Sequence, residues 1–444
     1  MDNKKRDQWG SKLGFVLAAA GSAVGLGNIW RFPYITGKYG GAAFVFIYIA
    51  VVALIGMSVM IAELSLGRNS RLDVVGTFKK LAGFPWTIIG WSGLLACTLL
   101  LSYYAVIAGW TFVYMFKSVS GLMETAAAGT TEQVFIEFIS DPVQSIFGLV
   151  AVMGLVVLIV CRGISSGIER ACKFLMPALF LILLVLIVRS VTLDGASKGL
   201  EFYLKPDFSK VTMEAVFAAL GQGFYSLSLG VGMILTYGTY LDKKEYLPSA
   251  ASHVVVLDTM VAFLSGLVIF PAVFAFGMDP GAGAGLAFIT LPCVFAKMPF
   301  GGFFSGAFFM LLFLASLTSA ISILEVVVTY AVDQLNWSRK KGTVLFSILI
   351  TILGVPSALS QGAMELNVFG MSFLDAVDFF TNRIAMPVGG LLIAVFVGWF
   401  WHEKAKIEIT NNGTREFALY NVWLWSCRII APMAILLIFF DGFF

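Results

Sequence analysis

Two stretches of the chain combine closely spaced glycines with polar side chains inside long apolar runs: residues 21–28 (GSAVGLGN) and residues 226–232 (SLSLGVG). Glycine weakens a helix interior by roughly 1 kcal/mol relative to alanine, so both stretches favour a break in a helix. Backbone groups released inside a membrane each cost several kcal/mol unless a partner satisfies them. Released carbonyls suit a hard cation, and the amide ends of half-helices suit a carboxylate.

The elements that carry these stretches must lie in a membrane. The chain is 59% hydrophobic and only 12% charged, whereas soluble domains are about 25% charged. A net charge of +3 gives no indication of a nucleic-acid partner. Since a membrane helix needs about 20 apolar residues, we expect an all-α membrane protein in the lipid bilayer. Its eleven transmembrane helices are expected near residues 12–36, 41–67, 86–116, 143–161, 168–188, 213–240, 247–277, 300–332, 342–360, 369–401 and 419–441.

Positive charge in the connections orients these helices. One alternate set of connections holds most of the lysine and arginine residues, and it includes the first residues of the chain, with Lys4, Lys5 and Arg6. By the positive-inside rule this set faces the cytoplasm. We therefore expect a cytoplasmic N-terminus and, after eleven spans, an extracellular C-terminus. The first residues show no cleavage site and predict a cytoplasmic tail.

The glycine-rich stretches fall in the first and the sixth span. Inverted repeats with interrupted helices at corresponding places form a binding site where the breaks meet. We expect a tail (1–11), a first five-helix repeat (12–190), an extracellular connection (191–212), a second repeat (213–401), and a cytoplasmic loop with the eleventh helix (402–444). The alternative is that the glycines only allow neighbouring helices to pack closely.

Other functions find little support in the residues. The five cysteines form no CxxC pair and are expected to be core residues, and His253 and His402 share no metal-ligand spacing. An intramembrane enzyme needs a nucleophile with a base, or metal ligands. A channel needs rings of carbonyls or charges along a pore, whereas here the polar groups gather at one depth. We therefore favour a carrier.

Several motifs resemble those of one transporter family. They are residues 25–33 (GLGNIWRFP), Glu63 with Gly67 and Arg68, Tyr103 and Tyr104, and residues 226–230 (SLSLG), 317–319 (LTS) and 373–378 (FLDAVD). Spread over nearly the whole chain, they resemble the neurotransmitter:sodium symporters, which have the LeuT-type fold. The resemblance implies a sodium-coupled amino acid symporter that works by alternating access. Eleven spans and short tails are similar to bacterial members, which implies a bacterial inner membrane, and no obligatory protein partner is implied.

The resemblance also implies two sodium ions at the breaks. The ligands of one, between helices 1 and 8, would be the carbonyls of Gly21, Val24 and Ala315 and the hydroxyls of Thr318 and Ser319. Residues 315, 318 and 319 do share one helical face, but adjacent hydroxyls can equally bond to their own helix. The ligands of the other would be Ala23, Asn28, Ser226 and Asp258, completed by the substrate carboxylate.

Gly25 bears on the substrate class. Monoamine carriers of the family have an aspartate at this position, which stands in for a carboxylate that their substrates lack. Glycine here implies an amino acid, whose carboxylate would accept a hydrogen bond from Tyr104. The implied substrate contacts are Ala23, Gly25, Gly27, Leu100, Tyr104, Tyr225, Ser226, Ser228, Val231, Met233, Ala320 and Ile323.

These contacts carry no charge. Val231 stands where a leucine-selective member has phenylalanine, which implies space for hydrophobic and aromatic L-amino acids. Apart from the resemblance, a stripe of methionine and aromatic residues more often indicates core packing.

Gates are implied on both sides of the site. The outer gate residues are Arg31 and Asp378, with Tyr225 as a lid, and the inner ones are Arg6, Trp9, Asp333 and Tyr240. An unpaired charge inside a membrane is expensive, which is why each charged residue is expected to have a partner.

Helix 5 and two further carboxylates also have expected roles. Gly167 and Pro177 have the spacing that, in similar carriers, lets the inner end of helix 5 unwind and admit water. Of two further intramembrane carboxylates, we expect Glu63 to brace the break in helix 6 and Glu325 to be structural.

Asp258 also bears on chloride. Chloride-dependent members have asparagine at this position and serine four residues later, where this chain has Ala262. A fixed carboxylate can compensate the charge of two cations, so chloride-independent transport is expected. Alternatively, a lone intramembrane aspartate can relay protons, and both roles can coexist.

Overall fold

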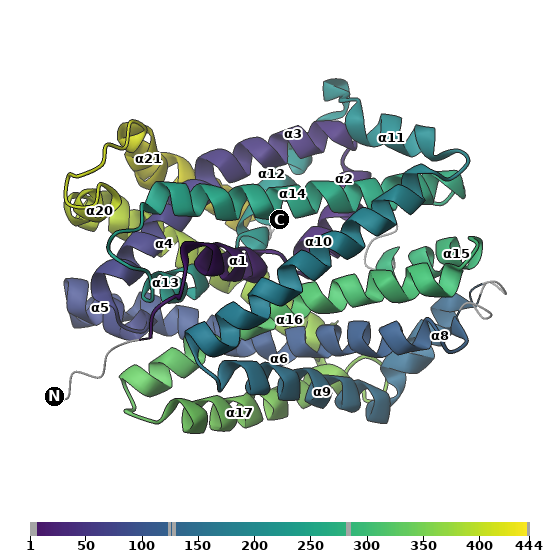
Figure 1. Cartoon of the computed structure of the whole chain (residues 1–444), viewed down its shortest axis with the longest axis horizontal. Coiled ribbons are helices and arrows are strands. Elements are labelled where there is room, and N and C mark those ends of the chain that lie inside the picture. Colours follow the sequence, from purple (N-terminus) through teal and green to yellow (C-terminus); the bar gives the residue numbers. More distant parts are fainter. Residues whose placement is uncertain (1–6, 123–125, 127–129, 281–285, 442–444) are drawn as a thin grey trace.

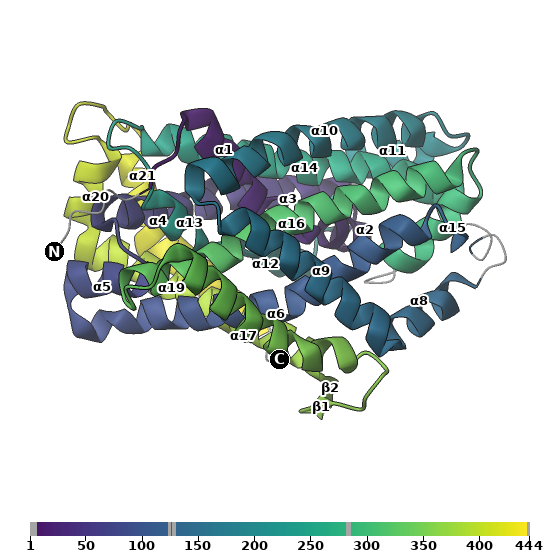
Figure 2. The ribbon, with the colours of Figure 1, turned by 60° about the horizontal axis from the view of Figure 1, so that its bottom comes forward.

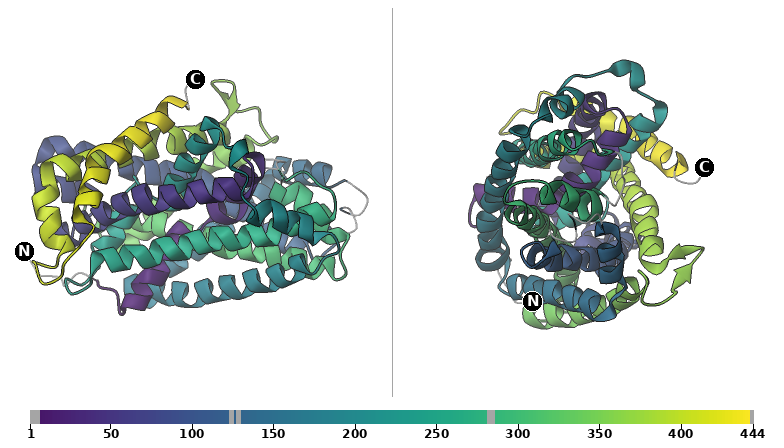
Figure 3. Two further views of the ribbon diagram at one scale, coloured as in Figure 1. Left: turned by 90° about the horizontal axis from the view of Figure 1, so that it is seen from above. Right: turned by 90° about the vertical axis from the view of Figure 1, so that its right-hand side faces the viewer.

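The computed structural model describes residues 7–122, 126, 130–280 and 286–441, which form an elongated bundle of helices. Most helices run along the long axis of Figure 1. At its left end lie α5 (Val74–Ala82) and α20 (His402–Ile409). At its right end lie α8 (Thr131–Ser140), α11 (Ala196–Leu204) and α15 (Leu291–Ala296). The right-hand view of Figure 3 looks along the bundle.

The first half of the chain supplies five spans, several of which contain a π-helical turn. They are α1 (Lys12–Ala23) with η1 (Gly27–Arg31) and α2 (Phe32–Lys38); α3 (Ala42–Val51) with η2 (Val52–Gly56) and α4 (Met57–Ser70); η3 (Phe84–Trp86) with α6 (Thr87–Lys117); α9 (Pro142–Val160); and η4 (Ile164–Glu169) with α10 (Arg170–Val191).

The second half supplies the remaining spans. They are α12 (Met213–Ser226) with α13 (Met233–Gly238); α14 (Leu247–Ala275); α16 (Gly301–Asp333); α17 (Arg339–Leu359); α18 (Phe373–Phe379) with η7 (Phe380–Ala385), α19 (Met386–Val395), η8 (Phe396–Trp401) and α20; and α21 (Tyr420–Trp425) with η9 (Ser426–Ile430) and α22 (Ala431–Asp441). The connections contain η5 (Phe208–Lys210), η6 (Leu286–Thr290) and the antiparallel strands β1 (Asn367–Val368) and β2 (Met371–Ser372), which project beyond α17 in Figure 2.

This architecture confirms the predicted all-α membrane fold. Among the described residues, nine helices are long and apolar enough to cross a membrane, and the first span makes a tenth, with its two halves bent by 55°. The sixth span consists of halves of 14 and 6 residues, each too short alone. The interrupted spans are therefore the two that carry the glycine-rich stretches.

The tenth span is longer than predicted. Helix continues past residue 401 to the end of α20 at Ile409, in a segment that was expected to be a cytoplasmic loop. Glu408 near its end is buried against α4, where Arg68 forms an ion pair with it at 3.0 Å. A tertiary contact of this kind stabilises a helical turn that the apolar pattern alone does not indicate.

The long helices α6 and α16 pack against each other at the centre of the bundle, and α1 packs against α10, α14 and α16. The halves of the sixth span pack on the second, α12 against α3 and α13 against α4. Small residues permit these approaches. A Cβ on Gly93 of α6, for example, would lie 3.0 Å from the Val231 carbonyl. This packing brings the two breaks together inside the bundle.

Candidate functional site

The first span is interrupted at residues 24–26, between α1 and η1. Val24 is extended, with ψ of 104°, so the carbonyls around it turn away from the helix. The Ser319 hydroxyl lies 3.5 Å from the Gly21 carbonyl, 3.3 Å from that of Val24 and 3.2 Å from that of Ala315. The Thr318 hydroxyl instead bonds to its own helix, at 3.0 Å from Ala315. The five predicted oxygens thus lie together, with Ser319 next to the three carbonyls and Thr318 next to that of Ala315.

The sixth span is interrupted at residues 227–232, between α12 and α13. Ser228, Gly230 and Gly232 have φ values of 56°, 85° and 84°, a left-handed region that glycine adopts at little cost. The Glu63 carboxylate of α4 accepts hydrogen bonds from the backbone amides of Gly230 (2.7 Å) and Leu235 (3.2 Å). Glu63 therefore braces this break, as predicted.

Asp258 of α14 connects the two breaks. Its carboxylate accepts hydrogen bonds from Asn28 Nδ2 (2.7 Å), the Ser226 hydroxyl (2.9 Å) and the Tyr48 hydroxyl (3.3 Å). All four side chains are buried. Asn28 Oδ1 accepts from the Gly25 amide at 3.0 Å, which joins this cluster to the first break.

Three of the four residues predicted for the second sodium site therefore lie together, while the fourth, Ala23, lines the adjacent cavity. Sequence analysis missed Tyr48, which lies in an unbroken apolar run of α3. A single tyrosine in such a run was the only signal available, and the partners that make it polar come from other helices.

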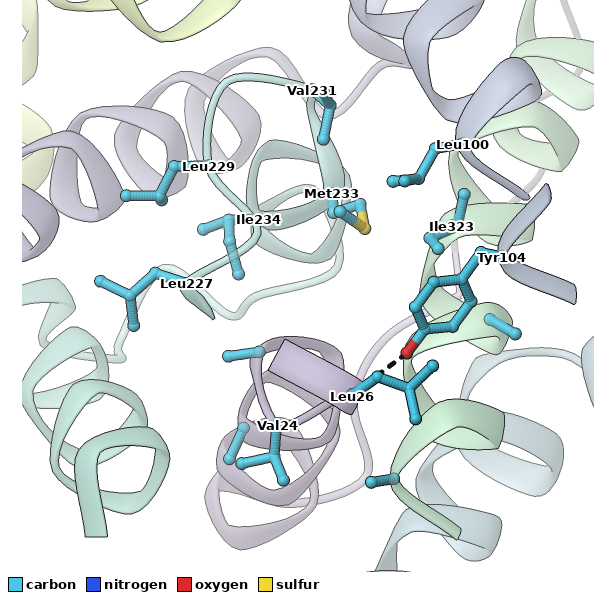
Figure 4. Packing of buried hydrophobic residues seen from close by; sticks show 14 of the residues in the cluster. Val24, Leu26, Leu100, Tyr104, Leu227, Leu229, Val231, Met233, Ile234 and Ile323 are labelled. Atoms are coloured by element: carbon cyan, nitrogen blue, oxygen red, sulfur yellow. Dashed lines mark hydrogen bonds between the residues drawn. The ribbon is translucent and has the colours of Figure 1, made fainter. Parts of the chain in front are cut away.

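A cavity of ≈ 30 Å³ lies between the breaks. All predicted substrate contacts line it except two, and the further residues on its wall are Ser22, Leu26, Ser319 and Met386. Figure 4 shows Leu100, Met233, Ile323 and Tyr104 directed toward one space, with the Tyr104 hydroxyl 3.5 Å from the Leu26 amide. Among the residues that the structure describes, no side chain on this wall is charged. One side of the cavity is thus apolar and the other consists of backbone and hydroxyl groups.

Val231 and Ala320 do not reach the cavity wall. The left-handed glycines on either side of Val231 turn its carbonyl toward α6, where it accepts from the Cys97 thiol at 3.3 Å. Both residues are fully buried. They lie behind the wall, and the larger side chains of Met233 and Ile323 line it instead (Figure 4).

Two glycines keep the cavity open on the side of the first break. A Cβ on Gly25 would lie 2.8 Å from Ser319 Oγ and 3.0 Å from the Tyr104 hydroxyl oxygen. A Cβ on Gly27 would lie 2.6 Å from the Tyr225 ring. Any larger residue at position 25 therefore occupies the space in front of Tyr104.

Tyr225 and Met386 separate this cavity from a second one of ≈ 320 Å³. The Arg31 guanidinium lies over the Tyr225 ring, 4.7 Å from its centroid. Asp378 accepts from Asn382 at 2.7 Å, and among the described residues it forms no ion pair with Arg31. The expected outer pair is therefore not formed in this structure, where Arg31 contacts Tyr225 and Asp378 bonds to Asn382.

Aromatic residues cover the opposite end of the first span. The Trp9 ring lies 5.2 Å from that of Tyr237 and 6.3 Å from that of Tyr240, measured between centroids. Its indole nitrogen donates to the Tyr237 carbonyl at 3.1 Å. Asp333 accepts from the Asp73 amide at 2.7 Å. Arg6 lies outside the described residues, so its pairing with Asp333 stays a prediction.

Glu325 has partners that the sequence did not indicate. The Tyr240 hydroxyl donates to its Oε1 at 2.7 Å, and Arg339 of α17 forms an ion pair with it. The carboxylate of α16 thus links the end of the sixth span, at Tyr240, to the first residue of α17.

The inner end of helix 5 is wound in this structure. Gly167 lies in η4 and Pro177 lies inside α10. Between them, Glu169 accepts hydrogen bonds from the Gly10 amide (2.6 Å) and the Ser11 hydroxyl (2.9 Å). The segment before α1 is therefore attached to the part of helix 5 that was predicted to unwind.

Interrupted helices that meet at a buried polar site, with cavities and covering side chains toward the ends of the bundle, define a secondary transporter of the inverted-repeat class. The carbonyl, hydroxyl and carboxylate oxygens that gather at the two breaks are the kind of ligand that a hard cation prefers. The fold and the site thus specify a carrier coupled to a cation.

The chain belongs to the sodium:neurotransmitter symporter family, whose model matches residues 6–134 and 133–444. It is 39% identical to the uncharacterized sodium-dependent transporter YhdH of Bacillus subtilis, over 99% of this chain and 98% of that one. An uncharacterized sodium-dependent transporter of Haemophilus influenzae is 35% identical, over 100% and 99%. The crystal structure of MhsT in complex with L-phenylalanine is 43% identical in sequence and has a TM-score of 0.89, covering 98% of this chain and 100% of MhsT. The protein is thus a multi-pass membrane protein of sodium-coupled transport, not an enzyme.

Proposed function

We propose that the protein is a symporter of hydrophobic and aromatic L-amino acids in a bacterial inner membrane, with its N-terminus in the cytoplasm. The observation that carries this proposal is the uncharged cavity between the two breaks. Leu100, Met233 and Ile323 form its apolar side, and backbone groups of residues 22–27 form its polar side. A zwitterion with an apolar side chain matches both sides.

The recognition of the amino acid backbone follows from the same wall. The Tyr104 hydroxyl faces the amide of Leu26, and both are donors for a carboxylate in the space that Gly25 leaves open. Carbonyls at the breaks accept hydrogen bonds from an ammonium group. The phenylalanine complex of MhsT supports an aromatic substrate for a chain 43% identical to it.

Two sodium ions are proposed as coupling ions, one beside Ser319 and one beside Asp258. The first site has only neutral oxygens, and the second contains a buried carboxylate. Two monovalent cations with a zwitterion bring two positive charges into a site of low dielectric, where a compensating anion is needed. Asp258 supplies that charge, and transport is therefore proposed to be independent of chloride.

Alternating access follows from the size of the cavity and from what covers it. At ≈ 30 Å³ it is far smaller than an aromatic amino acid, so the substrate must displace the wall. On one side the substrate has to displace Tyr225 and Met386, since these two residues line both cavities. On the other side the Trp9 cluster and helix 5 must move.

Uptake by proteoliposomes tests the proposal. Radiolabelled L-phenylalanine should enter saturably under an inward sodium gradient in gluconate medium, and a sodium ionophore should abolish accumulation. Unlabelled leucine and tryptophan should compete, and glutamate and lysine should not. Uptake without sodium, or equal competition by charged amino acids, contradicts the proposal.

A further inference from the structure

A basic hollow of ≈ 750 Å³ lies at the end of the bundle where α9 ends and α17 begins. Its residues come from α9, from the turn before η4, from η4 and α10, and from α17. They are Val157, Leu158, Cys161, Arg162, Ser166, Arg170 and Lys340.

The three cations of this hollow are exposed. Among the described residues, Arg162, Arg170 and Lys340 form no ion pair with a carboxylate. Of the carboxylates close to these elements, Glu169 pairs with Lys173 at 2.6 Å and Glu325 of α16 pairs with Arg339. The Asp7 carboxylate lies beside Gly163, and the three exposed cations outnumber it. The positive charge of the hollow is therefore directed outward.

An apolar hollow of ≈ 340 Å³ continues from the basic one and shares Val157 with it. It follows the seam between α9 and α17, which are in contact and lie together at the lower edge of Figure 1. Its residues are Val150, Met153, Gly154, Val157, Val344, Ser347, Ile348, Thr351 and Ile352. Val150, Ile348 and Ile352 are 52%, 52% and 61% exposed.

The two hollows together have the dimensions of a lipid. From Val160, two residues before Arg162, to Val150 the helix α9 rises by about 15 Å at 1.5 Å per residue, and α17 runs back over a similar length from Lys340 to Ile352. Half of a hydrocarbon core is about 15 Å thick. An acyl chain in the apolar seam thus places its phosphate among the three cations.

We propose that this groove binds an anionic phospholipid of the cytoplasmic leaflet. The phosphate lies between Arg162, Arg170 and Lys340, and an acyl chain follows the seam between α9 and α17. Basic pockets between transmembrane helices on the cytoplasmic side suit such headgroups. The choice of leaflet rests on the proposed orientation. A soluble anion would bind the three cations but would leave the apolar seam between α9 and α17 without a ligand.

The bound headgroup bridges helix 5 and α17. Arg170 and Ser166 flank Gly167, in the segment that has to open in the proposed transport cycle, whereas Lys340 lies on the neighbouring helix. An anion between them holds the wound form of helix 5. The lipid is thereby placed where it stabilises the state closed to the cytoplasm.

Native mass spectrometry of the delipidated protein in detergent tests the charged half. Phosphatidylglycerol should remain bound where phosphatidylcholine does not. Since each surface cation contributes about fivefold to anionic lipid binding, the variant R162Q/R170Q/K340Q should bind phosphatidylglycerol roughly a hundredfold more weakly. The matched control K79Q/K244Q/K404Q removes three exposed cations from the same end and should bind as the parent does. Equal loss in the control overturns the site.

Gly154→Phe tests the apolar half. Gly154 lines the apolar hollow and a Cβ on it meets nothing within 4 Å, so a ring at this position takes the space of the acyl chain, and we expect at least tenfold weaker lipid binding. Inorganic phosphate and glycerophosphoglycerol, which lack acyl chains, should displace the lipid only weakly. If inorganic phosphate or glycerophosphoglycerol displaces the lipid as effectively as phosphatidylglycerol does, the site binds a soluble anion and the lipid assignment is overturned. A dimer in detergent that Gly154→Phe dissociates overturns it in favour of a second copy. None of these measurements depends on transport, so failure of the proposed symport leaves them decisive.

Discussion

The two interrupted spans satisfy their released backbone groups with different chemistry. At the first break, hydroxyls and amides face the free carbonyls: Ser319 lies near Gly21 and Val24, and Gln222 donates to Gly27 at 2.9 Å. At the sixth break, the carboxylate of Glu63 accepts from two free amides. The first set of partners consists of neutral hydroxyl and amide groups, whereas the second is a carboxylate of the protein itself.

The backbone conformations at the first and the sixth break also differ. Residues 21–28, all of them described, include no positive φ, and Val24 departs from helical geometry in its ψ of 104° while its φ stays at −70°. At the sixth break three residues occupy the left-handed region, which cannot rejoin a right-handed helix without large rotations. We infer that the first break is the hinge that responds to ions and that the sixth is a rigid frame.

The largest effect is expected for Glu63→Gln. The amide keeps the shape of the side chain but removes the charge and one acceptor, leaving a buried backbone amide poorly satisfied. The free energy of unfolding in detergent should fall by about 3 kcal/mol, measured by denaturant titration of tryptophan fluorescence. Saturating sodium should not restore it, because the frame is independent of ions. Glu137→Gln, at an exposed position of α8, serves as the control, and an equal loss there contradicts the role of Glu63.

Asp258→Asn should affect ion binding rather than the frame. Removing the charge from a buried carboxylate that accepts three hydrogen bonds costs about 3 kcal/mol, so sodium-dependent uptake should fall on the order of a hundredfold. The unfolding transition without sodium should change much less than that of Glu63→Gln. A parent-like sodium dependence of uptake in Asp258→Asn argues against this site.

The same position predicts a response to chloride. In Asp258→Asn the donors Asn28, Ser226 and Tyr48 lose their anion, and adding Ala262→Ser places a hydroxyl one helical turn away. The double variant should regain part of its uptake in chloride but not in gluconate, whereas the parent should transport equally in both. Strong chloride dependence of the parent would falsify the proposed role of Asp258.

A smaller effect is expected for Ser319→Ala at the first break. One oxygen is lost from a neutral set, which corresponds to about 1–1.5 kcal/mol and roughly a tenfold higher sodium concentration for half-maximal substrate binding. Ser316→Ala is the matched control, because its hydroxyl bonds the Phe313 carbonyl of its own helix at 2.9 Å. If the sodium concentration for half-maximal binding rises equally in both variants, the Ser319 hydroxyl only bonds to its own helix and does not ligate sodium.

The sequence predicted features that are local. The breaks follow from Gly25, Gly27, Gly230 and Gly232, and the helices follow from apolar runs. The partners that complete the site depend on which helices meet. Tyr48 belongs to an apolar run and is polar only because α3 passes Asp258.

The outer gate shows the limit of assigning partners by pattern. Arg31 and Asp378 match a gate pair, yet in this structure Arg31 lies on Tyr225 and Asp378 bonds to Asn382. The sequence indicates that each of these two charges needs a partner. Which partner it has in a given conformation depends on the local packing.

The smallest effect is expected for Val231→Phe, which tests whether the sixth break is a rigid wall of the pocket. Val231 lies fully buried between two left-handed glycines, behind Met233 rather than on the cavity surface. If the frame is rigid, the larger ring cannot be relieved by backbone motion and must push Met233 toward the substrate. Tryptophan should then lose affinity several-fold relative to leucine, with Val231→Leu intermediate, while the sodium dependence of binding stays unchanged. Competition binding at fixed sodium measures the ranking. An unchanged ranking, or an altered sodium dependence, means that the sixth break yields as the first one does, and the distinction between hinge and frame then fails.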